Sequence, residues 1–565
     1  MADNTFDVNL ISEETGQEIV AALKAGPGSP DIDIKALVDG TNTTELFWKF
    51  YSRLNAEGVV DRYSILERFA KAIAGAWNGK TYTLRYYDAN VSQLTGMTPM
   101  DDLAGKTAAQ LCTESTTVVA DWADEDPMTW YIRANALSLQ NGHMNVLAIE
   151  GEDTFDISGE TAPVYTFALA LWIKEWNDGT YNYISFRTTQ GPGFYPDAGD
   201  VGPDNKKRAL TWHPTFGGGL NSAGKLTSGA GIKPYIFASA DTGNTKAKLW
   251  NSYEGLWNDC DTRWLLRMWQ LRHFDMENGN ILEGCTNYSV QYQVAAAEAN
   301  VKRVLVTTAQ GANFIVGSTV SVGDRAGDTS STDRGRADLR NIADCVKISS
   351  IETVTVEGVS YSAINLEVSS PFTTTAATMI STMPWHSGST EGLPGHKDGS
   401  MHSLTNGKNP CRIAGVEVLD GAYALGLDPL YNVTAGDDAD HFNYAIYECK
   451  NSENLANSIT ANYVNTNLGA TNVMKGWSWV KSFITTRLGV LFPGSFGGDS
   501  AKYFKSAFLG TDSAGLRCPW RFGDLNGGGY AGVACEYGYV SPGYSYWRSR
   551  PRLGGSGKKR GEWTA

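Results

Sequence analysis

A stretch rich in glycine and tyrosine near the end of the chain restricts what this sequence can fold into. Between Gly523 and Trp547 there are five tyrosines and seven glycines, and the only charged residues are Asp524 and Glu536. The stretch shows neither the alternation of a half-buried strand nor the apolar stripe of a helix. Glycine permits turns with positive φ, and tyrosine offers a large ring and a polar tip at little cost in side-chain entropy. The composition is typical of a binding loop, and it fits equally a terminal loop that packs its tyrosines on its own core.

Tryptophan and arginine residues flank this stretch and indicate a rigid frame on either side of it. Trp520-Arg521-Phe522-Gly523 precedes it, and Trp547 is followed by a segment that ends in Arg550-Pro551-Arg552-Leu553. An Ala-Gly-Val-Ala core at 531–534 and a Ser-Pro-Gly turn at 541–543 lie between them. This order of segments resembles the variable region of phage proteins that are diversified by retroelements.

The resemblance implies a C-type lectin fold of the formylglycine-generating-enzyme type, whose rigid frame holds a diversified surface. Two upstream segments resemble parts of that fold. Pro410 to Gly421 matches an Arg-x-x-Gly-x-Glu-x-x-x-Gly segment that leads into a central strand, and Leu265 to Leu271 is similar to the preceding core helix. The C-type lectin-like domain is therefore expected to combine residues 256–300 and 386–565, with a variable region at about 516–553.

The resemblance also divides the variable region into a diversified face and a scaffold. Adenine mutagenesis of AAC or AAT codons yields Tyr, Asn, Asp, Gly, Ser or Val, but never Trp or Glu. The candidate receptor-binding residues are Asp524, Asn526, Tyr530, Tyr537, Tyr539, Val540, Tyr544 and Tyr546. The residues expected to form the scaffold of the site are Trp520, Arg521, Gly532, Trp547, Arg550 and Arg552. Aromatic anchors are expected to dominate the binding free energy.

The whole chain is predicted to be an α+β, β-rich multidomain protein. Its 565 residues suffice for several structural units, and its 61 glycines and 26 tyrosines favour sheets joined by turns. Residues 1–80 are expected to be a helical segment, and residues 81–255 a β-sandwich-like middle domain. Residues 301–385 are expected to form a small β-barrel-like insertion in the C-type lectin-like domain.

Three helices are predicted in the N-terminal segment. Thr15 to Glu18 fits a capping box, and apolar residues at helical spacing mark Glu45 to Ala56 and Arg62 to Trp77. Such a segment suits an anchor to other virion proteins or an assembly module. A small helical cap on the next domain fits the spacing equally well.

Strand patterns follow in the middle domain and in the insertion. Alternating apolar residues at Thr81 to Tyr87 and Tyr181 to Phe186 predict strands, and Asn177-Asp178-Gly179 predicts a hairpin turn. Trp176-Asn177-Asp178 and Trp257-Asn258-Asp259 match a triplet of calcium-dependent lectins, but the chain lacks the partner motif of those sites. Five short runs predict the strands of the insertion: Val304–Val306, Phe314–Val316, Val320–Val322, Val346–Ile348 and Ala363–Leu366.

A formal net charge of −14 argues against a nucleic-acid partner, because phosphate binding needs basic patches. Lys558-Lys559-Arg560 is a basic cluster near the end of the chain, and it is expected to lie in a solvated terminus. No apolar run reaches about 18 residues, so no membrane insertion is expected. The polar start of the chain predicts synthesis in the cytoplasm of a bacterial host. The eight scattered cysteines are expected to be reduced and mostly buried.

No metal site, cofactor or catalytic group is predicted. The seven histidines form no His-Glu-x-x-His motif, and the loop offers only Asp524 and Glu536 as hard oxygen ligands. Thr511 to Gly515 lacks the Gly-x-Ser-x-Gly elbow of serine hydrolases. Cys518 and Cys535 are farther apart than the paired cysteines of formylglycine-generating enzymes. A pair of carboxylates for glycan hydrolysis stays open, because their separation in space is not visible in a sequence.

Three functions are therefore weighed: a receptor-binding protein of the virion, a glycan-degrading tailspike enzyme, and a purely structural head or tail fibre. The tyrosine-rich loop favours the first. The resemblance implies a location on the virion surface, a host-cell surface protein or glycan as the ligand, and a homotrimer. The N-terminal segment, residues 1–80, is expected to contact other virion proteins.

Overall fold

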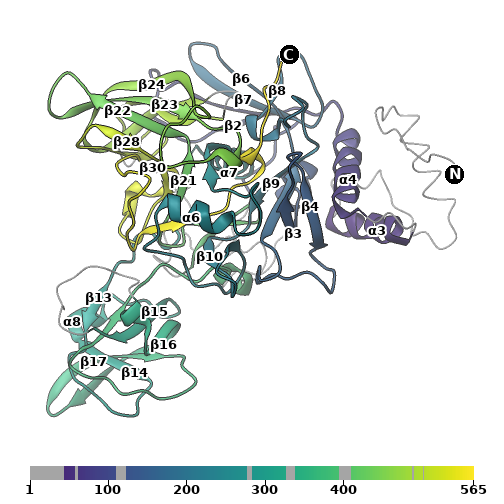
Figure 1. Ribbon diagram of the computed structural model, residues 1–565. Helices are drawn as coiled ribbons and strands as arrows, with labels where there is room; N and C mark the ends of the chain where they lie inside the picture. The colour runs from purple at the N-terminus through teal and green to yellow at the C-terminus, as the bar shows by residue number, and fades with distance from the viewer. Residues whose placement is uncertain are drawn as a thin grey trace.

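The computed structural model describes residues 43–56, 61–109, 122–276, 283–325, 337–393, 409–485, 489–499 and 502–564. Strands dominate these residues and form several sheets (Figure 1). The β-rich character predicted from the sequence is therefore present. One large core cluster contains buried side chains from Leu46 to Leu553. The N-terminal helices, the middle strands and the C-terminal strands thus share a core.

The middle region contains two sheets of four or more strands. The first has the strand order β2-β1-β7-β6-β8, with β1 (Tyr82–Tyr87), β2 (Thr98–Asp101), β6 (Trp172–Asn177), β7 (Tyr181–Arg187) and β8 (Tyr195–Pro196). The second has the order β4-β3-β5-β9, with β3 (Tyr131–Ser138), β4 (Met144–Ile149), β5 (Val164–Leu169) and β9 (Leu210–Pro214). Asn177 pairs with Asn182 at the base of the β6–β7 turn, where Gly179 has a φ of 93°. The predicted hairpin turn is therefore confirmed.

Two helices lie where the sequence predicts them, α3 (Thr43–Ala56) and α4 (Arg62–Ala76). Asp61 caps α4, because its side chain accepts a hydrogen bond from the backbone N–H of Tyr63 at 3.1 Å. The predicted capping box at Thr15 to Glu18 lies outside the described residues.

The apolar faces of these two helices meet each other and the four-stranded sheet. The ring centroids of Phe47 and Phe69 lie 4.8 Å apart, and Phe69 meets Trp130 edge-on at 5.3 Å. Helix α4 packs against β4, β5 and β9, and Figure 1 shows both helices beside this sheet. The burial of these rings attaches the helices to the main core.

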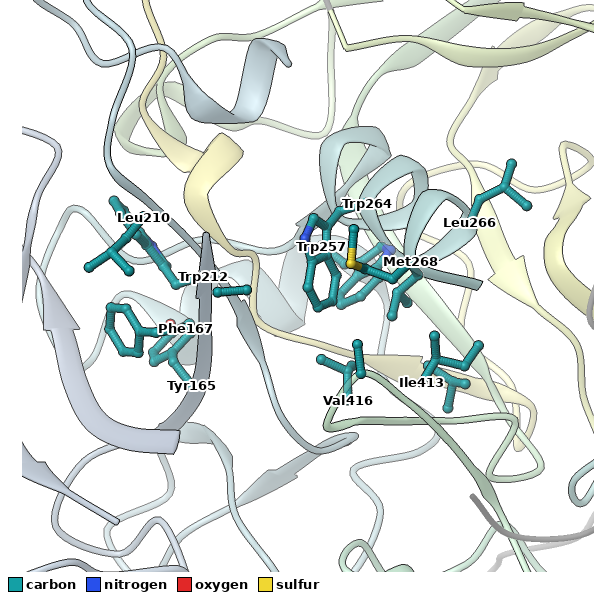
Figure 2. Close-up of a cluster of buried hydrophobic side chains, with 14 of the residues drawn as sticks. Tyr165, Phe167, Leu210, Trp212, Trp257, Trp264, Leu266, Met268, Ile413 and Val416 are labelled. Carbon is teal, nitrogen blue, oxygen red and sulfur yellow. The ribbon is translucent and has the colours of Figure 1, made fainter. Parts of the chain in front are cut away.

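A buried helix, α7 (Asp259–His273), lies near the centre of the molecule, where the sequence predicts a core helix (Figure 1). Asn258 and Asp261 form its capping box, so the Trp-Asn-Asp triplet at this position is the start of α7. Figure 2 shows Trp264 and Met268 of this helix in the main core, beside apolar side chains of the neighbouring strands. A shorter helix, α6 (Ala240–Ala247), precedes it.

The C-terminal region contributes an eight-stranded sheet in the order β12-β21-β29-β30-β27-β25-β26, with β31 also paired to β21. Its strands are β12 (Trp257–Asn258), β21 (Tyr423–Asp428), β25 (Gly476–Thr485), β26 (Leu491–Phe496), β27 (Ala507–Gly510), β29 (Trp520–Phe522), β30 (Gly532–Tyr537) and β31 (Ser549–Pro551). A four-stranded sheet has the order β24-β23-β22-β28 and consists of β22 (Leu430–Ala435), β23 (His441–Glu448), β24 (Val464–Met474) and β28 (Gly515–Arg517). A two-stranded ladder joins β10 (Gly218–Leu220) to β11 (Leu226–Ser228).

The segment from Pro410 to Gly421 contains a tight hairpin of β19 (Cys411–Ile413) and β20 (Val416–Val418). Gly415 turns the chain with a φ of 82°. A Cβ atom at this position would lie 2.5 Å from the ring of Tyr131. Both the left-handed backbone and the close approach of this ring therefore require glycine.

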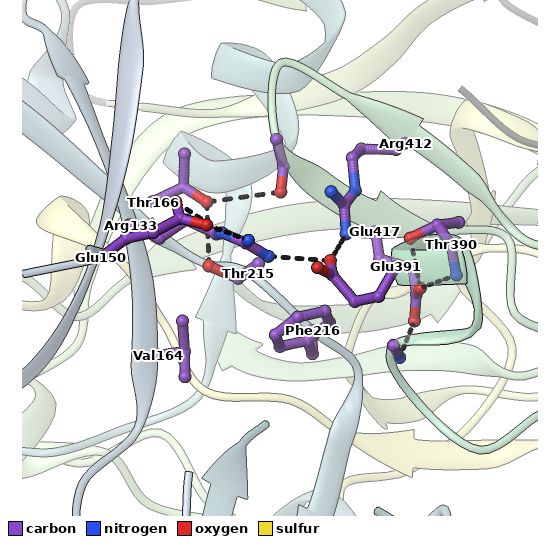
Figure 3. A network of polar contacts seen from close by, with 12 residues as sticks. Arg133, Glu150, Val164, Thr166, Thr215, Phe216, Thr390, Glu391, Arg412 and Glu417 are labelled. Atoms are coloured by element: carbon purple, nitrogen blue, oxygen red, sulfur yellow. Dashed lines mark hydrogen bonds and ion pairs between the residues drawn. The ribbon is translucent and has the colours of Figure 1, made fainter. Parts of the chain in front are cut away.

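The charged residues of the same segment connect it to the rest of the molecule (Figure 3). Arg412 pairs with Glu391, and Arg133 donates to the same carboxylate at 2.7 Å. Glu417 is fully buried, and it accepts a hydrogen bond from the hydroxyl of Thr390 at 2.7 Å. Buried carboxylates need such partners, so the spacing of this segment reflects a structural network.

Residues 291–381 form a separate lobe with its own apolar core (Figure 1). Its sheet has the order β13-β18-β15-β16-β17-β14, and a hydrogen bond of 2.8 Å from the Ala295 N–H to the Leu305 carbonyl links the two edges. Four predicted runs lie in strands, but Phe314–Val316 is a loop whose Phe314 fills the core of the lobe. The elements are β13 (Gln291–Gln293), β14 (Arg303–Thr307), α8 (Thr308–Gly311), β15 (Thr319–Asp324), β16 (Ala343–Val356), β17 (Val359–Leu366) and β18 (Thr378–Ser381).

The basic cluster near the end of the chain is buried, so the prediction of a solvated terminus is wrong. Lys558 pairs with Glu254 at 2.5 Å. Arg560 pairs with Asp428 at 2.9 Å and with Glu448 at 2.6 Å. All five side chains are buried. These carboxylates need counter-charges inside the fold, and the final segment supplies them.

No described helix is both long and apolar enough to cross a membrane. Six of the seven cysteines in the described ranges are buried, and Cys345 is half-buried. Burial raises the pKa of the Cys518 thiol to about 12, so this thiol is protonated at neutral pH.

Candidate binding surface

The tyrosine-rich stretch is built on strands of the eight-stranded sheet. The register places Trp520 opposite Tyr537, Tyr537 opposite Leu509, and Leu509 opposite Trp477. Directly opposed residues point to the same face of a sheet, so these four side chains form a row across β29, β30, β27 and β25. Trp520 is fully buried, whereas the rest of the row is partly accessible.

Further rings extend this row into one continuous surface, which we name the aromatic surface. Trp477 and Tyr530 are stacked, with centroids 4.8 Å apart and an angle of 7° between the rings. The ring centroid of Tyr537 lies 6.0 Å from that of Trp477 and 5.5 Å from that of Trp520. The ring centroids of Trp520 and Tyr544 lie 5.8 Å apart. The aromatic surface consists of Phe237, Trp477, Trp479, Tyr530, Tyr537, Tyr539, Tyr544 and Tyr546.

Solvent reaches a large part of this surface. Tyr530 is 37 % exposed, Phe237 is 40 % exposed and Tyr544 is 45 % exposed. Tyr537, Tyr539 and Tyr546 are half-buried, and Asn526, which precedes Tyr530 in the sequence, is exposed. Single exposed rings are common on proteins, but a contiguous group of them marks an interaction surface.

Two of the predicted receptor-binding residues are buried and do not belong to the aromatic surface. Asp524 is 1 % exposed; it accepts the N–H of Asn526 at 2.9 Å and pairs with Arg548 at 3.4 Å. Val540 is 4 % exposed, and its carbonyl accepts the N–H of Cys518 at 3.0 Å. Both positions are predicted from the residue types that adenine mutagenesis can yield, and a residue type of this kind does not show whether the side chain is buried.

The predicted scaffold residues are all buried. Arg521 forms ion pairs with Asp259 of α7 at 2.5 Å and with Glu536 of β30 at 2.9 Å. Arg550 pairs with Asp420 at 2.5 Å. A buried guanidinium held by two carboxylates fixes the strands to the helix beneath them.

The remaining scaffold residues complete the frame. Arg552 donates to the carbonyl of Glu417 at 2.7 Å and lies over the ring of Trp257 at 4.6 Å. Trp547 belongs to a small buried cluster, and Gly532 opens strand β30 opposite Phe522. The exposed rings therefore stand on a fixed support, which limits the entropy lost when a partner binds.

The stability of this frame depends on pH through Glu536. Burial raises the pKa of Glu536 to about 7, although the charge of Arg521 opposes the shift. Because the ordinary value is 4.5, the folded protein binds more protons than the unfolded chain between these two values. The contribution of Glu536 to stability is therefore present below pH 4.5 and is lost as the pH rises through about 7.

We expect the substitution Glu536→Gln to flatten this loss, because glutamine does not titrate. The free energy of unfolding is measured by urea denaturation at about pH 5 and about pH 8. The difference between the two pH values is expected to be smaller in the variant than in the unchanged protein. An equally steep fall in both proteins contradicts the assignment.

Three members of the aromatic surface, Trp477, Trp479 and Phe237, are not among the predicted binding residues. Trp477 and Trp479 alternate with Ser478, which places both rings on one face of a strand and is a usable sequence signal. Phe237 has a φ of 54° in a loop and donates its N–H to the carbonyl of Tyr546 at 3.0 Å. No local pattern marks Phe237, because its role depends on a residue far along the chain.

The chemistry that this surface offers is that of ring faces, phenolic hydroxyls and backbone groups. The hydroxyl of Tyr539 donates to Asp512 at 2.6 Å. No group of three or more His, Cys, Asp or Glu residues within the described ranges is arranged to hold a metal ion.

No protein-family model matches this chain, and no curated protein matches it either.

Proposed function

We propose that this chain is a receptor-binding protein of a phage virion, and that its aromatic surface binds the host cell. The observation that carries the proposal is the contrast between a buried Trp and Arg frame and the exposed rings that it holds together. Tyrosine and tryptophan contribute disproportionately to binding free energy at interfaces. The ligand is a protein or a glycan of the host-cell surface.

The proposal includes the other parts of the chain. The C-terminal region without the separate lobe forms a C-type lectin-like domain of the formylglycine-generating-enzyme type, and the lobe, residues 291–381, is an insertion in it. Residues 1–80 attach the protein to other virion proteins. The protein is a homotrimer, which presents three aromatic surfaces and raises the avidity for a cell. Nucleic acid, cofactors and membrane insertion have no part in the proposal.

Competition between the purified protein and intact phage for the host bacterium tests this function. We expect the protein to block phage adsorption as its concentration rises, because both use the same receptor. Undiminished adsorption at saturating protein contradicts receptor binding and favours a purely structural fibre. Release of shortened glycans from host cell walls favours the tailspike enzyme instead.

Chelation of divalent cations is expected to leave adsorption of the purified protein unchanged. Calcium takes about six to eight oxygen ligands, whereas the aromatic surface offers mainly ring faces and neutral hydroxyls. Binding of labelled protein to host cells is measured with and without EDTA. A loss of binding that added calcium restores contradicts this expectation.

A further inference from the structure

A cavity of about 290 Å³ opens where the five-stranded sheet, helix α7 and the β25–β26 hairpin meet. Its wall includes Tyr86 near the end of β1, Glu175 of β6, Gln270 of α7 and Phe483 of β25. The volume is near the lower end of the range of small-molecule sites, about 300 to 1,000 Å³. None of the residues in the wall belongs to the aromatic surface, which begins at the other half of β25 with Trp477.

The charges in and behind this wall are paired with one another. Arg267 forms ion pairs with Asp197 and, at 3.5 Å, with Glu175. Arg263 lies 3.4 Å from the same aspartate. Lys481 donates to an asparagine side chain of the wall at 2.9 Å. Because cations and carboxylates compensate each other, the wall suits a neutral polar ligand better than an anion.

Two polar groups of the wall make no hydrogen bond within the part of the chain that the structure describes. These groups are the side-chain amide of Gln270, a residue that is 5 % exposed, and the hydroxyl of Tyr86. Both residues line the open cavity, so these groups can exchange water for a ligand. Both groups can donate and accept, so a ligand with hydroxyl groups satisfies them.

Aromatic rings complete the wall. Phe504 meets Phe483 edge-on at 4.8 Å and Tyr86 at 6.3 Å. These rings offer apolar faces beside the amide, the hydroxyl and the carboxylate already described. A sugar unit combines C–H faces with several hydroxyl groups in one small neutral molecule.

We propose that this cavity binds one unit of a neutral saccharide. Its C–H groups pack against the rings, its hydroxyl groups donate to Glu175, and others pair with Gln270 and Tyr86. The proposal does not rest on the function of the aromatic surface, because the two sites share no residue.

The charges beside Glu175 favour binding over cleavage of the sugar. Burial raises the pKa of Glu175, but the charges of Arg267 and Arg263 outweigh burial and hold it below its usual value. The acid of a glycosidase needs a raised pKa to keep its proton at neutral pH. Glu175 is therefore an ionised acceptor of hydrogen bonds and not a proton donor.

Saturation-transfer NMR and calorimetry with four probes test the proposal on the full chain. The neutral probes are methyl α-D-glucopyranoside, methyl β-D-galactopyranoside and N-acetylglucosamine, and the charged probe is glucuronate. We expect at least one neutral probe to bind with a millimolar dissociation constant. Failure of all three neutral probes, or tighter binding of glucuronate than of every one of them, overturns the proposal.

Variants locate the binding in the cavity. Gln270→Ala and Tyr86→Phe each remove one polar group of the wall. Each is expected to lower the affinity for the bound probe by about threefold to tenfold. Gln293→Ala, on the separate lobe, is expected to leave the sugar affinity unchanged. If Gln270→Ala does not fold, the nearly isosteric Tyr86→Phe decides. Unchanged affinity in Tyr86→Phe and in any folded Gln270→Ala overturns the assignment to this cavity.

Discussion

Replacing Tyr530 and Tyr544 together by alanine is expected to lower the affinity of the protein for host cells by at least about 100-fold. These are the two most exposed tyrosines of the aromatic surface, at 37 % and 45 %. A central aromatic anchor commonly contributes about 2 kcal/mol or more to binding. Because both side chains lie outside the buried frame, the variant is expected to stay folded. Binding of labelled protein to host cells gives the affinity.

A matched control separates this effect from a general loss of exposed rings. Trp176 and Tyr183 also form an exposed stacked pair, with centroids 4.7 Å apart, on the β6–β7 hairpin. Replacing both by alanine is expected to leave the affinity unchanged. Equal affinities of the Tyr530→Ala, Tyr544→Ala variant and the unchanged protein place the receptor site elsewhere.

Replacing Arg521 by alanine is expected to lower the free energy of unfolding by about 3 to 5 kcal/mol. Its guanidinium is 1 % exposed and neutralises Asp259 and Glu536, which are themselves buried. Without it, Asp259 and the ionised fraction of Glu536 stay inside the fold with no counter-charge from this residue. Urea denaturation at neutral pH measures the loss.

Arg303 provides the control for this substitution. It pairs with Glu298 at 2.6 Å on the separate lobe, and its side chain is 30 % exposed. Solvent screens such a pair, so Arg303→Ala is expected to cost about 1 kcal/mol or less. A loss for Arg521→Ala no larger than for Arg303→Ala contradicts its role as the centre of the frame.

Elements whose signals are local could be predicted from the sequence. Helix α4 and strand β7 follow the spacing of apolar residues within a single short segment. The turn at Asn177 to Gly179 depends on residue types that favour it at adjacent positions. These patterns can be recognised because each is complete within one short segment, whichever distant element the segment packs against.

Errors occurred where burial depends on distant partners. An apolar run predicted a strand at Phe314 to Val316, but a buried loop residue leaves the same signal. Lys558 and Arg560 have the composition of a solvated tail, and only the buried carboxylates elsewhere in the chain explain their burial. Such partners lie more than a hundred residues away in the sequence, so no window of the sequence contains them.

In the candidate site, too, some residues can be predicted from the sequence and others depend on distant partners. Adenine mutagenesis never yields tryptophan, so codon chemistry assigns Trp520 and Trp547 to a frame, and both are buried. Trp477 joins the aromatic surface only through the pairing of β25 with β27 and of β27 with β30. Codon chemistry cannot recognise that Asp524 and Val540 are buried. A sequence can therefore indicate which residues bind, but the strand order decides which of them meet.

Sequencing this gene from many phages of one population tests most directly the claim that the aromatic surface is a diversified receptor-binding surface. Substitutions are expected to concentrate at exposed and half-exposed positions, namely Asn526, Tyr530, Tyr537, Tyr539, Tyr544 and Tyr546. Trp520, Trp547 and the buried Asp524 and Val540 are expected to stay constant. A near-copy of this coding region with differences only at adenines is expected beside a reverse transcriptase gene. Substitutions spread evenly over the chain, or concentrated at the two tryptophans, contradict the claim.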